Sequence, residues 1–431
     1  MLTWITKTAK GQKGNKRSFL SSLRTSKGNA GHMPRSILNT DLRLLILSMS
    51  LRRTILGCLQ VIRSLYLYII GYDLMAIGLL SMIATIVGAM RSVFIGILAD
   101  KYGRKGFIVL GGLSSTVRLL IYAFFTDYTM LIAAQIIGAM GEGAGAGQPS
   151  VSGMIADKSM KESRTKIFTI FALTNSFVGI LGSLLGSLPK PLQSWLLIGE
   201  AESFRLLFLF CAFLSFISFI FVIPIREEPP RNRGGRRESF LPKKSTATIS
   251  RFSVVRAIGG FGFGITGDLI GPWFKIKFSM GEEVLGPVYA VSRFIVMLLY
   301  LLIFKVEKDL DEVKIIALNR ILSAAAMLLI PFVPGCLEFS LLLIAYRVSI
   351  TITMPIRQAF IVSIVDPSER SSAVGFSNLA RMSIRSFAPA IGGYIMQSIS
   401  MSLPFVIGAA VIALNGVSYQ FFFGKRRRST S

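Results

Sequence analysis

Charged residues interrupt several long apolar stretches of this chain, and their types and positions could support proton or solute chemistry. A charge at the centre of a bilayer costs about 2.5–3.5 kcal/mol on insertion scales, so each one needs a physical reason. The acids are Glu142 and Asp268. The bases are Arg63, Arg118, Arg293 and Arg347, together with Arg381 and Arg385, which are four residues apart and are expected only to line the cytoplasmic cavity.

The two acids are the candidate proton carriers. Glu142 lies in the run 140–147 and Asp268 follows the run 260–267, and both runs are rich in the glycine that allows close helix approach. Burial disfavours the charged form of a carboxylate, whereas a neighbouring arginine favours it. We therefore expect both acids to exchange protons, with the first four arginines as charge partners or substrate anchors. The alternative is a set of structural ion pairs that never titrate.

The composition predicts that membrane-spanning helices position these charges. The chain has 431 residues, of which 52% are hydrophobic and only 16% are charged, and its mean hydropathy is +0.61. A soluble protein of this composition would need an implausibly large core. The sequence therefore predicts an all-α integral membrane protein whose surface contacts the lipid bilayer.

The basic residues are distributed in a way that predicts the orientation in the membrane. The formal net charge is +26, and the bases concentrate in segments 7–53, 158–166, 226–251 and 425–428. These segments fall on one side of the predicted spans, as the positive-inside rule requires. We expect both termini in the cytoplasm and a multi-pass protein of the cell membrane. Since the bases are spread over tails and loops, we expect no nucleic-acid partner.

Twelve apolar spans divide into two groups of six. They lie near 54–71, 75–98, 106–126, 129–154, 166–188, 204–225, 252–274, 284–305, 313–333, 339–363, 372–397 and 403–423. The predicted organisation is a basic tail (1–41), a six-helix bundle (42–225), a polar linker (226–251), a second six-helix bundle (252–424) and a short basic tail (425–431).

Several kinds of chemistry find no support in the sequence. The only histidine, His32, lies in the basic N-terminal segment, and the cysteines Cys58, Cys211 and Cys336 are scattered in or beside apolar spans. These residues predict neither a metal site nor a Ser-His-Asp hydrolase. The phosphate-binding pattern G-x-x-x-x-G-K-[ST] is absent from the sequence. We expect no cofactor and no enzymatic activity.

A short charged loop joins the second and third spans, and it carries a recognisable pattern. Residues 96–105 read G-I-L-A-D-K-Y-G-R-K. This pattern resembles the loop between helices two and three of transporters of the major facilitator superfamily. Stretches around 355–360, 366–370 and 388–393 resemble the tenth and eleventh helices of the same family.

The resemblance implies a gate on the cytoplasmic side. Gly96 would permit close helix packing and Gly103 a tight turn. Asp100 would face the positive N-terminal end of the eleventh helix, and Arg104 would pair with Asp157 at the end of the fourth. The alternative is that these charges only orient the chain in the membrane.

The resemblance also implies a fold and a function. The fold would be two parallel repeats of six helices with a solute site between them near mid-membrane. The function would be secondary transport of a small solute by alternating access, coupled to protons, as efflux of a drug or metabolite or as uptake of a metabolite. An uncoupled uniporter and a transport-inactive scaffold or sensor are the alternatives. The excess of arginines over acids in the spans favours an anionic or polar solute, and we expect a monomer.

Overall fold

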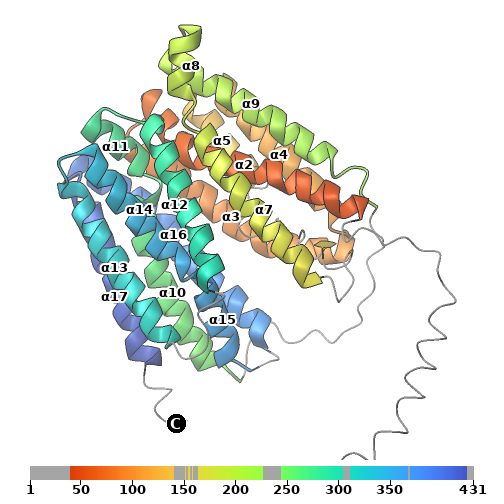
Figure 1. Ribbon diagram of the computed structural model, residues 1–431, viewed down its shortest axis with the longest axis vertical. Coiled ribbons are helices and arrows are strands. Elements are labelled where there is room, and N and C mark those ends of the chain that lie inside the picture. The colour runs from red at the N-terminus through yellow and green to blue at the C-terminus, as the bar shows by residue number, and fades with distance from the viewer. Residues whose placement is uncertain are drawn as a thin grey trace, which may run out of the picture. The chain divides into compact units, whose positions relative to one another are not determined.

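The structure of this chain is a computed structural model that describes residues 39–139, 151, 154–155, 158, 164–226, 244–303, 311–366 and 369–424. The chain divides into two units, Met1–Thr40 and Asp41–Ser431. Figure 1 shows the helices. All their residues belong to the second unit except Thr40, the first residue of the first helix described below.

All regular elements in the described ranges are helices, and they form two groups along the chain. The first half comprises α2 (Thr40–Ile69), α3 (Leu74–Tyr102), α4 (Lys105–Phe124), α5 (Tyr128–Ala139), α7 (Arg164–Leu185), α8 (Pro189–Leu196) and α9 (Glu200–Ile220). The second half comprises α10 (Thr246–Gly267), α11 (Ile270–Phe278), α12 (Glu282–Ile303), α13 (Glu312–Leu329), η2 (Ile330–Phe332), α14 (Cys336–Ile352), α15 (Met354–Ile364), α16 (Arg370–Ser398) and α17 (Leu403–Phe423).

The prediction of an all-α multi-pass membrane protein is confirmed. Ten helical segments in the described residues are long and apolar enough to cross a membrane, taking α10 with α11 and α14 with α15 as single segments. The remaining two predicted spans correspond to α5, of which the described part is short, and to α16. Although α16 is 29 residues long, Arg381 and Arg385 make it less apolar than the others.

The first predicted span was wrong at its beginning. It was expected to start near residue 54, but α2 starts at Thr40 and passes through Arg52 and Arg53 without a break. Arg52 is accommodated because it donates hydrogen bonds to the Ile108 carbonyl (2.7 Å) and the Ser218 hydroxyl (3.0 Å). The helix therefore tolerates charge where neighbouring helices supply acceptors.

Two other predicted spans are interrupted in the structure. The seventh, expected near 252–274, begins at Thr246 and is divided into α10 and α11 at Asp268 and Leu269. The tenth is divided into α14 and α15 at Thr353, two residues before Pro355. Since proline lacks a backbone donor and disfavours helix before it, the second break has a local cause.

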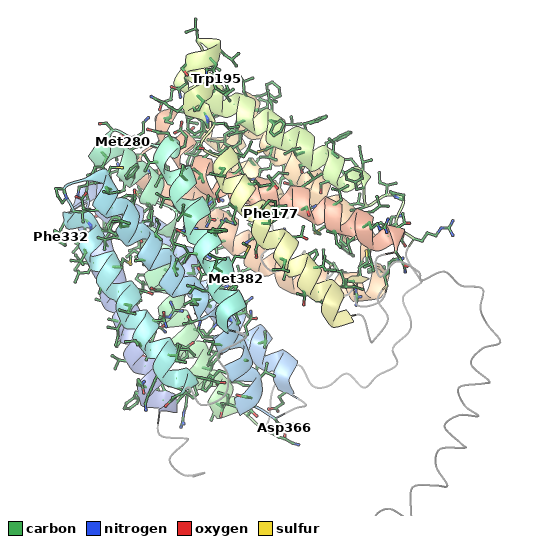
Figure 2. The ribbon with its side chains drawn as sticks, viewed as in Figure 1. Phe177, Trp195, Met280, Phe332, Asp366 and Met382 are labelled. Carbon is green, nitrogen blue, oxygen red and sulfur yellow. The ribbon has the colours of Figure 1, made fainter. Side chains whose placement is uncertain are left out.

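Large apolar side chains project from the outer faces of many helices. Phe177 on α7, Trp195 on α8 and Phe332 at the end of η2 are all strongly exposed (Figure 2). Exposed apolar surface on this scale would promote aggregation in water, whereas a bilayer solvates it. These side chains fit the lipid-facing surface that the composition predicts.

Glycines allow the helices of the first half to approach closely. A Cβ placed on Gly57 of α2 would lie 2.8 Å from the Gly179 carbonyl oxygen and 3.1 Å from the Gly182 backbone, both on α7. A Cβ placed on Gly88 of α3, by contrast, meets no atom within 4 Å. Gly57 and Gly88 therefore offer a matched comparison, because only Gly57 lies where close packing leaves no room for a Cβ atom.

We predict opposite effects for Gly57→Ala and Gly88→Ala. Alanine improves helix propensity by about 1 kcal/mol over glycine, so Gly88→Ala should raise the unfolding temperature. Gly57→Ala should lower it, because pushing backbone apart costs about 1–3 kcal/mol. A thiol-reactive fluorophore can follow unfolding in detergent, since Cys58 and Cys211 are buried. A rise for Gly57→Ala would contradict the close α2–α7 contact.

Candidate functional site

The candidate site centres on an ion pair between the two halves. Arg63 of α2 and Asp268, between α10 and α11, approach within 3.5 Å through the Arg63 Nη2 and the Asp268 Oδ1. The two side chains are 20% and 23% exposed. The pair is therefore partly screened by protein and partly accessible to water.

The helix break places Asp268 at this position. The α10 helix ends at Gly267, and Asp268 follows it in a turn that the Leu269 N–H closes on the Thr266 carbonyl (2.9 Å). The break falls inside the apolar segment Thr246–Phe278 and not at its end. The glycine-rich part of α10 before the break allows close helix contact, because Gly260 and Gly264 pack against α16. The carboxylate therefore lies at a helix interruption within the membrane-spanning segment.

A second contact between the halves lies one turn away on α2. The Arg293 Nη2 on α12 donates a hydrogen bond to the Gln60 Oε1 (2.5 Å). Gln60 and Arg63 are three residues apart and thus share one helix face. Arg293 also lies beside Gly179 of α7, near the Arg53 side chain. One face of α2 therefore meets two segments of the second half, the turn between α10 and α11 and the α12 helix.

Arg347 contacts an aromatic ring near this group. Its guanidinium carbon lies 3.7 Å from the centre of the Tyr289 ring, which is buried on α12. A cation–π contact of this kind stabilises the charged guanidinium of Arg347 in a region with few carboxylates. Tyr289 is also electrostatically coupled to Asp268 and Arg293. The structure thus brings together four of the predicted residues: Arg63, Asp268, Arg293 and Arg347.

Sequence reasoning missed two members of this group. Gln60 could have been found, because it lies one helical turn before the predicted Arg63. Tyr289 carries no charge and lies in an apolar helix, so no sequence signal separated it from ordinary core aromatics.

Arg118 lies elsewhere, inside the first half. It is buried on α4, where its side chain fills the space beside Gly138 of α5. Its guanidinium lies 5.5 Å from the Tyr122 ring centre, and the Tyr122 hydroxyl accepts a hydrogen bond from Gln135 (2.7 Å). The structure therefore does not place Arg118 with the group at Asp268.

The remaining predicted residues fall partly outside the described region. Glu142 and Asp157 lie outside the described residues, and of Gly96 and Asp100 only their place in α3 is described. Gly103 has a φ of 100°, a conformation that favours glycine, and Arg104 directly precedes α4. The pairing of Arg104 with Asp157 stays a prediction.

Contacts between the halves gather at the end of the molecule that carries α8 and α11. Lys275 of α11 forms a salt bridge with Glu200 at the start of α9. Gln397 of α16 donates to the Asp73 carboxylate (2.9 Å) and accepts from the Met75 N–H (3.2 Å) at the start of α3. Figure 2 shows Asp366 at the opposite end from Met280 and Trp195.

Aromatic and hydrogen-bond contacts also hold the segment between α2 and α3 in place. The Tyr72 hydroxyl donates to the Thr126 carbonyl (2.5 Å), and the Tyr72 and Tyr128 ring centres lie 5.5 Å apart. Burial and the nearby Asp127 carboxylate raise the pKa of Tyr72. The phenol therefore remains a neutral donor at physiological pH.

A family model and several known proteins resemble this chain. The model of the Major Facilitator Superfamily matches residues 45–387. An uncharacterized membrane protein of Saccharomyces cerevisiae is 21% identical over 422 residues, which cover 89% of this chain and 94% of that protein. The quinolone resistance protein NorA of Staphylococcus aureus (strain MRSA252) is 25% identical over 203 residues, which cover 47% of this chain and 49% of NorA.

A solved structure shows the same architecture. The nucleoside transporter NupG superposes with a TM-score of 0.70 and 17% identity, covering 90% of this chain and 99% of NupG. At this identity the likeness shows the fold alone.

We predict that Arg63→Gln and Asp268→Asn are energetically coupled. Each single variant leaves a charge without its partner and should lower the unfolding temperature, whereas the double variant should recover most of the loss. The interaction should be about 0.5–3 kcal/mol, as for residues in direct contact. Combining Asp268→Asn with Lys190→Gln, at an exposed residue on α8, provides the additive control. Full additivity for Arg63 and Asp268 would show that the pair is not coupled.

Proposed function

The chain belongs to the Major Facilitator Superfamily, whose members are non-enzymatic transporters of small solutes, and we propose that it is a proton-coupled secondary transporter of the cell membrane. The observation that carries the proposal is the Arg63–Asp268 pair, which joins the two halves at a helix break. A carboxylate in this position changes the attraction between the halves when it gains or loses a proton. Proton binding and rearrangement of the halves are thereby linked.

The coupling follows from the charges around Asp268. When Asp268 is ionised, it attracts Arg63 and holds α11 against α2. Protonation removes that attraction and leaves Arg63 available to an anionic or polar solute. Arg53, Arg293 and Arg347 add positive charge around the same region. Among the described residues, none of these three pairs with a carboxylate, and Asp268 pairs with Arg63.

Alternating access gives the two ends of the molecule opposite roles. With the termini in the cytoplasm, the contacts of Glu200, Lys275 and Gln397 close the outer end, and the solute site opens toward the cytoplasm. The loop at 96–105 would close the inner end in the other state, with Asp100 and Arg104 as its charged contacts. The likeness to the resistance protein NorA supports efflux as the direction.

The coupling proposal predicts that Asp268→Asn abolishes proton-driven flux. Proteoliposomes loaded with a pH-sensitive dye would be exposed to a panel of solutes, with and without an imposed pH gradient. The wild-type protein should show proton movement with a transported solute, and Asp268→Asn should lose it while retaining solute exchange across the membrane. Asp127→Asn, at an exposed carboxylate, is the matched control.

Two outcomes would contradict this reading. A wild-type flux that ignores the pH gradient for every transported solute would indicate a uniporter. No flux of any solute would favour a transport-inactive scaffold or sensor.

Alternating access predicts that a bulky residue at Gly393 opens the outer end. Gly393 of α16 packs on the backbone of Leu74 and Met75 in α3, whereas a Cβ at Gly375 of the same helix meets nothing within 4 Å. Gly393→Leu should block transport by holding the halves apart at this end, and Gly375→Leu should not.

Cysteine accessibility can measure this change. Ser64 lies beside Gly271 at the contact between α2 and α11. In a Cys336→Ser background, Ser64→Cys should react several-fold faster with an impermeant maleimide on intact cells when Gly393→Leu is present. An unchanged rate would contradict the proposed role of the α3–α16 contact.

A further inference from the structure

A second group of arginines lies inside the second half, on helices that do not contribute Arg63 or Asp268. The four residues are Arg256 on α10, Arg320 on α13, Arg357 on α15 and Arg381 on α16. Arg256, Arg320 and Arg381 lie in the interior of their helices, and Arg357 lies in the first turn of α15, just after the break at Thr353. They form one layer across four helices.

The layer separates two apolar clusters. One cluster contains Phe252, Ile316 and Phe360, whereas the other contains residues further along the same bundle, such as Ala324. Arg320 lies between Ile316 of one cluster and Ala324 of the other on a single helix. Four guanidinium groups thus interrupt what would otherwise be a continuous hydrophobic core.

The protein supplies only neutral acceptors for these cations. The Arg256 and Arg381 Nη2 atoms both donate to the single Asn378 Oδ1, at 3.4 Å and 3.0 Å. Arg357 donates to the carbonyls of Thr353 and Ile350, both at 3.3 Å, at the break between α14 and α15. Two cations therefore share one amide oxygen.

Arg320 is the least compensated member. Its side chain is only 4% exposed, and it makes no hydrogen bond to any residue that the structure describes, so its buried Nε has no partner there. Arg256 and Arg357 are near enough to repel it electrostatically. The Nε atoms of Arg256 and Arg381 are also buried without a partner in the described part of the chain.

A buried cation without an anion is costly. Within the described ranges, the salt bridges involve none of these four arginines. An unpaired charge in a protein interior carries a desolvation penalty of several kcal/mol, which neutral acceptors offset only in part. An anion among the four groups would remove both the repulsion and the missing hydrogen bonds.

We propose that Arg256, Arg320, Arg357 and Arg381 bind an oxyanion, and that a phosphate group is the best chemical match. Guanidinium groups donate paired hydrogen bonds to phosphate oxygens in a fixed planar geometry. Several acceptor oxygens on one tetrahedral centre can serve donors that arrive from four helices. The phosphate belongs either to a soluble organic phosphate or to the headgroup of an anionic lipid. The site does not depend on proton coupling at Asp268.

The test measures the unfolding temperature of the purified full-length protein in a neutral detergent. Sodium phosphate is titrated at constant ionic strength, with sodium chloride making up the difference. The wild-type unfolding temperature should rise and saturate, as for binding to the folded state. Arg320→Gln should abolish the saturable rise, whereas Arg251→Gln, at an exposed arginine of α10, should retain it.

The unfolding temperatures of the wild type and Arg320→Gln, compared with and without phosphate, distinguish a binding site from a structural role. Without phosphate, Arg320→Gln should unfold at the same or a higher temperature than the wild type, because it removes an uncompensated charge. With saturating phosphate, the order should reverse. A purely structural arginine would make the variant less stable under both conditions, which would overturn the proposal. If Arg320→Gln does not fold, Arg381→Gln takes its place.

Two further arms identify the source of the phosphate. Glycerol phosphate tests a soluble ligand, and mixed micelles of phosphatidylglycerol against phosphatidylcholine test a lipid headgroup. If either compound raises the unfolding temperature of the wild type saturably but not that of Arg320→Gln, the result supports the site and identifies the source of its phosphate. If neither phosphate compound distinguishes the wild type from Arg320→Gln, the proposal is wrong. General salt effects on stability act on both proteins alike and cancel in this comparison.

Discussion

A guanidinium group removed from water must receive acceptors, and this requirement organises the interior of the protein. Arg52 reaches a backbone carbonyl and a hydroxyl, Arg293 a glutamine, and Arg347 the face of a tyrosine. Within the part of the chain that the structure describes, only Arg63 of these four has a carboxylate partner. Its attraction can therefore be changed by a proton, whereas the contacts of the other three keep the same charge at all physiological pH values. Under the proposed proton coupling, the Arg63–Asp268 pair would therefore be the point of control by pH within the described residues.

Close glycine contacts determine which parts of the molecule can move together. Within the first half, Gly57 and Gly182 bring the α2 and α7 backbones together. Between the halves, Gly78 and Gly393 do the same for α3 and α16, at the end where Asp73 meets Gln397. Tight packing transmits displacement instead of absorbing it. A change at the contact between the halves is therefore expected to move whole bundles and not single side chains.

The sequence predicted the helical membrane fold well because its signal is local: long apolar stretches and charged ends need no knowledge of packing. It also indicated most of the residues near Asp268, because a charge inside a span is conspicuous. It did not indicate the break at Asp268, although the break has a local cause: Pro272 in the first turn of α11 cannot donate a hydrogen bond to the Asp268 carbonyl four residues earlier. Tyr289 and Asn378 were also missed, because their importance comes from partners on other helices. For the same reason the sequence did not indicate that Arg118 lies beside Tyr122 and Gly138, apart from the arginines near Asp268.

The helix breaks show an asymmetry between the halves that bears on mechanism. In a parallel repeat of six helices, α2 and the α10–α11 segment occupy equivalent positions, yet α2 is continuous and its counterpart is divided at Asp268. The tenth span is divided as well, at Thr353. Continuous α2 presents Gln60 and Arg63 on one helix face, whereas Asp268, the partner of Arg63, lies at a helix break. A change in the charge of Asp268 would therefore displace α11 more readily than α2. The second half would respond to the proton while the first half provides the fixed reference.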